Sequence, residues 1–210
     1  MEDIKSRIAK RAASVLHNGD IVNLGIGIPT MVADYLPESV IIQLQSENGF
    51  IGLGPKPSDD KIDPYISNAG GAYASILPGG AFFDSATSFG IIRGGHVDTT
   101  ILGALEVDEQ GNLASWIIPG KMVPGMGGAM DLVVGAKKVI VVMEHTNKGK
   151  PKIKKRCTLP LTAVSCVDMI ITEMCVMEFY QGSLHLIEIS DGYTLDDIKQ
   201  TTEADYIVNL

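Results

Sequence analysis

The strongest constraint on the fold is a short, unbroken run of apolar residues at positions 139–143, Val-Ile-Val-Val-Met. A strand with one face in water alternates apolar and polar residues, whereas a strand buried on both faces is apolar throughout. Strands of the second kind occur in parallel sheets that helices cover on both sides. Residues 20–24 and 40–44 are also short and largely apolar, and we expect them to be strands of the same sheet.

Helical patterns lie between these strands. Apolar residues recur at helical spacing in 4–16, and Asp84 and Thr194 can cap two further helices. Strands that alternate with helices predict an α/β layered domain. Apolar residues on either side of Gln181-Gly182-Ser183 predict a β-hairpin, so we expect the sheet to be mixed rather than purely parallel.

Several segments are expected to be turns or loops. Residues 25–29 predict a sharp turn, after which Thr30 can cap a short helix that ends at Tyr35. Residues 50–80 are rich in Gly, Pro and Asp and predict a long ordered loop. The segment 148–156 has six basic residues in nine and predicts a solvated loop, although it could also meet the phosphates of an anionic ligand.

Length and composition exclude several classes of protein. The 210 residues are expected to form one domain (1–210), and no apolar stretch is long enough to suggest a membrane span or a signal peptide. Seventeen basic and 25 acidic residues give a formal net charge of −8, which argues against nucleic acid as a partner. The histidines are scattered and the three cysteines lack CxxC spacing, so we expect no metal site and reduced thiols in a cytoplasmic protein (His17, His96, His145, His185; Cys157, Cys166, Cys175).

Glu47 is the first candidate for chemistry. It follows a predicted strand and precedes Asn48-Gly49, two residues that tolerate a positive φ. A side chain at such a strand end projects at the rim of the sheet, where α/β proteins place ligands. A carboxylate there can act as a nucleophile, a general base or a metal ligand, but a solvated turn glutamate has the same local sequence.

Two glycine-rich segments are further candidates. Gly25-Ile-Gly27-Ile-Pro29 could cradle a phosphate, or it could be only a tight turn, since it lacks the third glycine of the dinucleotide fingerprint. In Gly125-Met-Gly127-Gly128 the backbone N–H groups are unobstructed and could point at a developing oxyanion. The same glycines could instead serve only close packing.

Four motifs occur together in a fixed order. They are Asn23-Leu-Gly-Ile-Gly-Ile-Pro29, Gln45-Ser-Glu-Asn-Gly49 with Gly52-Leu-Gly54-Pro55, Ile92-Arg-Gly-Gly-His96, and Pro119-Gly-Lys-Met-Val-Pro-Gly-Met-Gly-Gly-Ala-Met-Asp131. This set resembles the B-type (β) chain of the short-chain 3-oxoacid coenzyme A transferases, with the strongest likeness to the butyrate–acetoacetate and acetate enzymes. The resemblance extends over nearly the whole chain.

The resemblance implies an open α/β sandwich with a mainly parallel sheet, a fold shared with sugar-phosphate isomerases. It implies that Glu47 is the covalent nucleophile and that Gly128, with Gly127 beside it, supplies an oxyanion-hole amide. It also implies that Asn23 lies near Glu47, and we expect Asn23, Gly25, Gly27, Asn48 and Gly127 to bind the substrate.

The resemblance also implies a transfer of CoA between a short-chain acyl-CoA and a carboxylate through a glutamyl-CoA thioester. Coenzyme A would be a substrate, with no cofactor and no metal. A second, A-type chain would complete the site, with two copies of each chain in the assembly.

One departure from the family bears on the substrate. Succinyl-dependent relatives tend to have a lysine after Asn-Ala-Gly, whereas this chain reads Asn68-Ala-Gly-Gly71, which favours monocarboxylate substrates. Two other functions stay open on the residues alone. One is a sugar-phosphate isomerase on the same fold, and the other is a non-catalytic chain that only scaffolds a partner enzyme.

Overall fold

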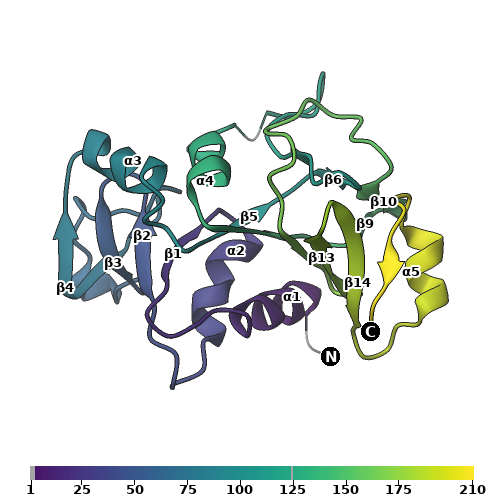
Figure 1. Ribbon diagram of the computed structural model, residues 1–210. Coiled ribbons are helices and arrows are strands. Elements are labelled where there is room, and N and C mark those ends of the chain that lie inside the picture. Colours follow the sequence, from purple (N-terminus) through teal and green to yellow (C-terminus); the bar gives the residue numbers. More distant parts are fainter. Residues whose placement is uncertain (1–2, 124) are drawn as a thin grey trace.

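A ten-stranded mixed sheet forms the centre of the molecule in the computed structural model, which describes residues 3–123 and 125–210 (Figure 1). Its strands, in spatial order, are β15 (Ile207–Val208), β14 (Ser183–Ile189), β13 (Cys175–Tyr180), β12 (Met169–Ile171), β8 (Lys138–Val142), β5 (Thr99–Gly103), β1 (Ile21–Leu24), β2 (Gln43–Ser46), β3 (Phe50–Gly54) and β4 (Ser75–Phe82).

The five central strands, from β12 to β2, run parallel to one another. Antiparallel pairs flank them, with β3 and β4 on one side and the β13–β14 hairpin on the other. The expected mixed sheet with a mainly parallel centre is therefore confirmed, and so is the hairpin around Gln181-Gly182-Ser183. Because the central strands are parallel, all their carboxyl ends lie at one edge of the sheet.

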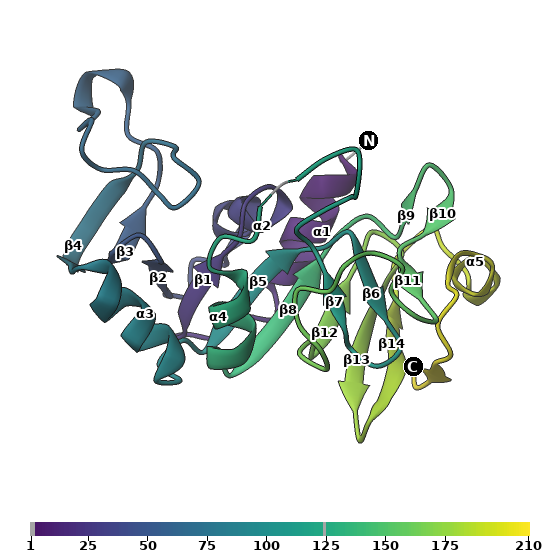
Figure 2. The ribbon, with the colours of Figure 1, turned by 90° about the horizontal axis from the view of Figure 1, so that it is seen from above.

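Helices cover both faces of the sheet (Figures 1 and 2). On one face lie α1 (Ile4–Ala13), α2 (Ile28–Met31) and the 3₁₀-helix Val32–Tyr35; on the other lie α3 (Ser85–Arg93) and α4 (Ala129–Gly135). The second face also carries a three-stranded sheet of β11 (Ile153–Lys154), β6 (Glu106–Asp108) and β7 (Leu113–Ala114). The remaining elements are β9 (Thr146–Asn147), β10 (Lys150–Pro151) and α5 (Leu195–Thr201).

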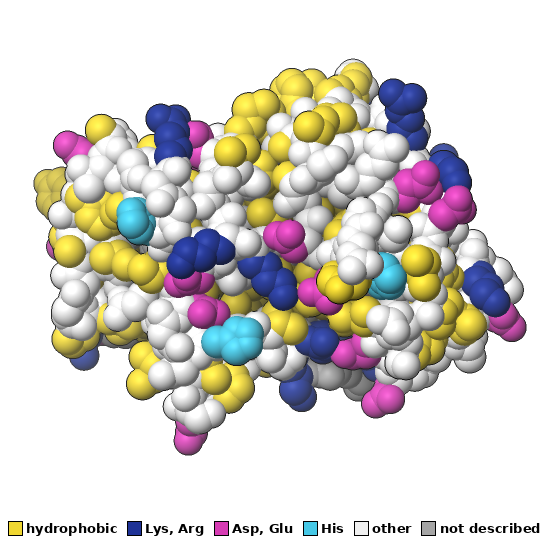
Figure 3. Space-filling view, viewed as in Figure 1, with side chains coloured by type: hydrophobic (Ala, Val, Ile, Leu, Met, Phe, Trp, Pro, Cys, Tyr) yellow, Lys and Arg dark blue, Asp and Glu magenta, His cyan; other side chains and the backbone are white. Residues whose placement is uncertain are grey.

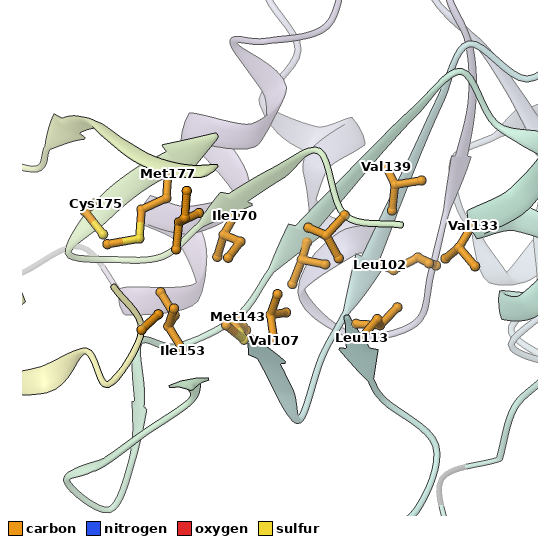
Figure 4. Close-up of a cluster of buried hydrophobic side chains, with 14 of the residues drawn as sticks. Leu102, Val107, Leu113, Val133, Val139, Met143, Ile153, Ile170, Cys175 and Met177 are labelled. Carbon is orange, nitrogen blue, oxygen red and sulfur yellow. The ribbon is translucent and has the colours of Figure 1, made fainter. Parts of the chain in front are cut away.

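Strand β8 shows why the central runs are apolar throughout. Val139 and Val141 point into one core cluster, together with residues from α3 and α4, while Ile140 and Val142 point into a second cluster with α1. All four side chains are at most 2% exposed. Figure 4 shows the first of these clusters, where Val139, Leu102 and Ile170 gather between the sheet and the small strands.

The expected helix caps are also present. The Asp84 side chain accepts a hydrogen bond from the Thr87 backbone N–H at 2.7 Å, and α3 ends at Gly94. Thr194 and Asp197 form a reciprocal capping box at the start of α5. The short helix after the 25–29 turn differs from expectation, because Gly27 is its N-cap and Thr30 lies inside it.

The prediction of a loop over 50–80 is wrong, because β3 and β4 form an antiparallel pair there. The pair contains a register shift between Ile51 and Leu53, and Gly52 at the shift has a φ of +85°. A β-bulge of this kind breaks the regular alternation of side chains on which sequence patterns depend. Only the connection between the two strands is irregular, apart from the 3₁₀ turn Asp59–Lys61.

The prediction that 148–156 is a solvated loop is also wrong. Ile153 is fully buried, and β11 pairs in parallel with β6. Lys154 donates a hydrogen bond to Glu203 at 2.7 Å. This pairing joins segments about 45 residues apart and leaves no local signal in a run dominated by lysine.

Other boundaries differ by a few residues. The predicted strand at 40–44 lies at Gln43–Ser46, and the strand predicted over 113–118 contains only Leu113–Ala114. None of the helices in the described part of the chain is long and apolar enough to cross a membrane.

We predict opposite effects of adding a methyl group to two helical glycines. A Cβ on Gly135 would clash with the Ile92 carbonyl oxygen where α4 packs on α3, whereas a Cβ on Gly90 would meet nothing within 4 Å. Gly135→Ala is therefore expected to lower the free energy of unfolding by about 1–3 kcal/mol. Gly90→Ala is expected to raise it by about 0.5–1 kcal/mol, since alanine is the better helix former. Denaturant unfolding measures both values, and equal effects would contradict the close packing of α3 and α4.

Candidate active site at the carboxyl edge of the parallel sheet

Glu47 lies at the carboxyl edge of the parallel sheet, directly after β2. A tight turn follows, in which the Gly49 N–H donates to the Ser46 carbonyl oxygen at 3.0 Å. Gly49 has a φ of +129°, and a Cβ there would clash with the Phe83 carbonyl oxygen. Only glycine fits this position, and the chain can then return at once into β3. The turn places the half-buried Glu47 side chain at the rim of the sheet.

Two donors from distant parts of the chain contact the Glu47 carboxylate. The Gly128 backbone N–H donates to Oε1 at 3.3 Å, and the Asn23 side-chain amide donates to Oε2 at 3.5 Å. Both contacts are long, and no lysine or arginine in the described residues forms an ion pair with Glu47. The carboxylate is thus oriented by weak donors and not neutralised by a cation.

A buried chain of polar side chains holds Asn23 in place. Its amide donates to Gln45 Oε1 at 2.7 Å, and the Gln45 amide donates to Ser88 Oγ on α3 at 3.0 Å. The three side chains are at most 2% exposed. Buried polar groups are costly unless they are paired, so this chain fixes the Asn23 amide beside Glu47. Gln45 and Ser88 were not predicted as site residues. A glutamine in a buried strand is uncommon, and it could have indicated a polar site.

Gly128 is the N-cap residue of α4, and it is buried. The first N–H groups of a helix have no partner within the helix, so this N–H is free to donate to Glu47. A Cβ on Gly128 would lie 3.0 Å from Glu47 Oε1 and 3.1 Å from Cδ. Gly127 is exposed, with a φ of +51°, and its Cβ would lie 3.7 Å from the same oxygen. The glycine pair is what allows the loop to approach the carboxylate.

The remaining predicted site residues do not touch the carboxylate. The Gly25 N–H donates to the Ile101 carbonyl oxygen at 2.8 Å, which binds the turn to β5, and Gly27 is exposed with a φ of +93°. The Asn48 side chain accepts from Ser46 Oγ and donates to the Ser67 carbonyl oxygen, both at 2.7 Å. These contacts give the three residues roles in shaping the loops, and substrate binding by them stays a prediction.

A cavity of about 570 Å³ lies at the same edge of the sheet, at the carboxyl ends of β5 and β8. The turn residues Ile26 and Pro29 line it on one side, and its charged walls comprise Glu106, Glu144, Lys150, Lys152 and Lys154. Ile26 also lies beside Gly70, where a Cβ would be 3.3 Å from Ile26 Cγ1. The turn at 25–29 therefore borders both the cavity and the loop around Gly70.

Two further observations bear on the chemistry of this edge. Burial lowers the pKa of His145 to about 4, and its ring nitrogens are each 3.0 Å from a threonine hydroxyl, those of Thr172 and Thr202. This histidine is therefore neutral and held in the core. Within 3–123 and 125–210, no group of three histidine, cysteine or carboxylate side chains could hold a metal ion.

The family model described as "Coenzyme A transferase" matches residues 5–201. The chain belongs to the coenzyme A transferase family. It is 58% identical over 207 residues to the beta chain of the acetate CoA-transferase of Escherichia coli (strain K12), covering 98% of this chain and 94% of that protein. It is 50% identical over 208 residues to the B-type chain of the succinyl-CoA:3-ketoacid coenzyme A transferase of Helicobacter pylori (strain ATCC 700392 / 26695), covering 99% and 100%.

Solved structures of CoA-transferases share the fold. An acyl-CoA transferase from Escherichia coli O157:H7 aligns with a TM-score of 0.77 at 24% identity, over 99% of this chain, which spans 42% of that longer one. Glutaconate CoA-transferase from Acidaminococcus fermentans aligns with a TM-score of 0.71 at 16% identity, over 100% of this chain and 89% of that one. The likeness to the B-type chain of a CoA-transferase and the α/β fold are therefore confirmed, and the match favours this enzyme class over a sugar-phosphate isomerase.

We predict that Gly128→Ala lowers the CoA-transferase rate about tenfold, because the added methyl group displaces the carboxylate by a few tenths of an ångström. Gly90→Ala adds the same methyl group in open space on α3 and is expected to keep the normal rate. Steady-state kinetics of both variants, with thermal unfolding to check folding, measures the difference. A Gly128→Ala variant with the normal rate would show that the Gly128–Glu47 contact has no catalytic use.

Proposed function

We propose that this chain is the catalytic B-type chain of a CoA-transferase that moves CoA between a short-chain acyl-CoA and a carboxylate. The donor would be butyryl-, acetoacetyl- or acetyl-CoA. The observation that carries the proposal is the Glu47 carboxylate at the sheet edge, contacted by the Gly128 N–H and the Asn23 amide and free of any cation among the described residues. The name of one relative, an acetate CoA-transferase, supports this substrate class, whereas the other relative is named for succinyl-CoA and a 3-ketoacid.

The proposed reaction is a ping-pong exchange. The Glu47 carboxylate attacks the thioester carbonyl, and CoA leaves as a thiolate, which gives an acyl–glutamyl anhydride. The thiolate then attacks the glutamyl carbonyl and releases the acid, so that CoA is held as a thioester on Glu47. The acceptor carboxylate reverses both steps. A covalent intermediate of this kind retains the free energy of the thioester, so no metal, nucleotide or other cofactor is needed.

The contacts of Glu47 suit the second step. When the thiolate attacks the glutamyl carbonyl, negative charge develops on a side-chain oxygen of Glu47. The Gly128 N–H already faces Oε1 and needs no rearrangement to stabilise that charge. One donor placed in this way contributes about 3–4 kcal/mol to transition-state stabilisation. The Asn23 amide, held by Gln45, serves the other oxygen.

The site must exclude water, since hydrolysis of the anhydride or the thioester would waste the cycle. We propose that an A-type partner chain covers it, with two copies of each chain in the assembly. Hydrophobic side chains gather over α4 and the neighbouring loops in the upper part of Figure 3. Exposed apolar residues of these segments include Met122, Val123, Met130, Val134 and Val164. Large exposed apolar areas mark interaction surfaces, and the loop that carries Gly128 belongs to this one. A cytoplasmic location stays a prediction.

The central experiment looks for the covalent intermediate. We expect the two-chain enzyme, incubated with acyl-CoA alone, to gain the mass of one CoA less one water on Glu47. Borohydride, which reduces a glutamyl thioester to an alcohol, should then inactivate it. Glu47→Gln should remove both the adduct and the transfer activity, because an amide is not a nucleophile, while the exposed Glu38→Gln should leave both unchanged. An active enzyme that carries no adduct would disprove the proposed mechanism.

The partner surface has a separate test. Val123→Asp places a charge on an apolar side chain that is 66% exposed, beside the Gly128 loop. We expect it to weaken the binding of a co-expressed A-type chain at least tenfold, because a charge must then be desolvated in the interface. Ile41→Asp is the control, since Ile41 is 70% exposed but lies at the opposite, amino end of β2. Equal binding by the two variants, measured by calorimetry or analytical ultracentrifugation, would place the interface elsewhere.

A further inference from the structure

Lys152 is a nucleophilic group that the proposed transfer mechanism does not use. It lies between β10 and β11, and its side chain lines the cavity of about 570 Å³ at the carboxyl ends of β5 and β8. Its backbone is fixed on both sides, because its N–H donates to the His145 carbonyl oxygen and its own carbonyl accepts from the Val107 N–H, both at 3.1 Å. The Lys152 backbone is therefore anchored beside the small sheet, where the residue forms part of the cavity wall.

The Lys152 amine, like that of Lys150 in the same cavity wall, has no partner among the described residues. Its Nζ forms no hydrogen bond and no ion pair with any residue of 3–123 or 125–210. In contrast, Lys154 donates to Glu203 at 2.7 Å, and Lys155 pairs with both Glu109 and Asp205. Lys152 is half-buried, whereas Lys150 is exposed, so Lys152 is the unpaired lysine of this wall that is partly withdrawn from water.

The surroundings of Lys152 also change its protonation. Burial lowers its pKa to about 8, although the carboxylates of Glu144 and Glu173 act in the opposite direction. The nearby His145 is neutral because burial lowers its pKa to about 4. At about pH 7.5, a lysine with a pKa of about 8 is neutral in about a quarter of the molecules, against about one in a thousand for an ordinary lysine. The neutral amine is the form that attacks carbonyl carbon.

We propose that Lys152 is a site of self-acylation, at which an acyl-CoA thioester in the cavity transfers its acyl group to the side-chain amine. The Nζ lone pair attacks the thioester carbonyl carbon, the C–S bond breaks, and CoA leaves as a thiolate. The thiolate takes up the proton that the nitrogen loses, so the products are a lysine amide and free CoA thiol. The inference rests on the proposed function in one respect, which is that this chain binds acyl-CoA.

The modification would change the cavity in two ways. A lysine amide is neutral, so Glu144 and Glu173 lose the cation that faces them. The acyl group also adds volume to a cavity at the same sheet edge as Glu47 and next to the turn at 25–29. Unlike a glutamyl thioester, an amide does not react with the acceptor carboxylate or with CoA. It would therefore accumulate with time of exposure to acyl-CoA.

The test follows acetylation of this lysine in the full chain. The protein is incubated with acetyl-CoA at about pH 7.5, treated with hydroxylamine to remove any thioester on Glu47 or on cysteine, and cleaved after glutamate. One peptide, 145–173, then carries the whole basic segment, because the chain has no glutamate between Glu144 and Glu173. Tandem mass spectrometry compares Lys152 with Lys154 and Lys155 in the same molecules, which makes the paired lysines internal controls.

We expect Lys152 to be acetylated at least about tenfold faster than Lys154 or Lys155. We also expect its rate to rise with pH and level off above about pH 9, where nearly all of the amine is neutral, while the rates at the other two lysines rise further. Equal rates at the three lysines, or no acetylation of Lys152, would overturn the proposal. The same measurement on Glu47→Gln separates it from the transfer mechanism, because that variant forms no glutamyl adduct but should acetylate Lys152 at the normal rate.

Discussion

The parallel hydrogen-bond ladder from β2 through β1, β5 and β8 to β12 is the constraint on which the other features depend. Parallel neighbours need crossover connections, and these connections place helices on both faces of the sheet. The strands must then be apolar on both faces, as β8 is. The same ladder brings every carboxyl end to one edge, so the segments that follow β1, β2, β5 and β8 meet there although they are far apart in the chain.

The Glu47 site is built from four segments of the chain. Asn23 comes from β1, Gln45 and Glu47 from β2 and its turn, Ser88 from α3, and Gly128 from the loop before α4. The Asn23 and Gln45 amide N–H groups donate along one buried chain, which holds them in one arrangement, although the Asn23 amide oxygen has no partner among the described residues. The carboxylate itself receives only two long contacts. A nucleophile needs this balance, because a cation or a short hydrogen bond on the carboxylate would stabilise the ground state that has to react.

The carboxylate and the cavity are parts of one edge rather than separate sites. Ile26 lines the cavity and also lies against Gly70, and the residue before Gly70, Ala69, donates its N–H to Ser46 Oγ at 3.1 Å. Ser46 immediately precedes Glu47. The turn at 25–29 thus contacts the turn at Ala69-Gly70. That second turn is hydrogen-bonded to Ser46, next to the nucleophile. A ligand that occupies the cavity and displaces Ile26 would act on this same turn.

The sequence by itself determined the buried parallel strand at 139–143, the caps Asp84 and Thr194, the hairpin at Gln181, and Glu47 at the end of a strand. Each of these is a local pattern, in which the residues that carry the signal are also the residues that form the structure. Only the tertiary structure decided that 50–80 contains a bulged strand pair, that β11 is buried against β6, and that Gln45 and Ser88 hold Asn23 beside Glu47. These features arise from contacts between residues distant in the chain. A bulge, a lysine-rich strand or a glycine loop leaves no periodic signal in the sequence, so packing alone selects the segment that pairs with it.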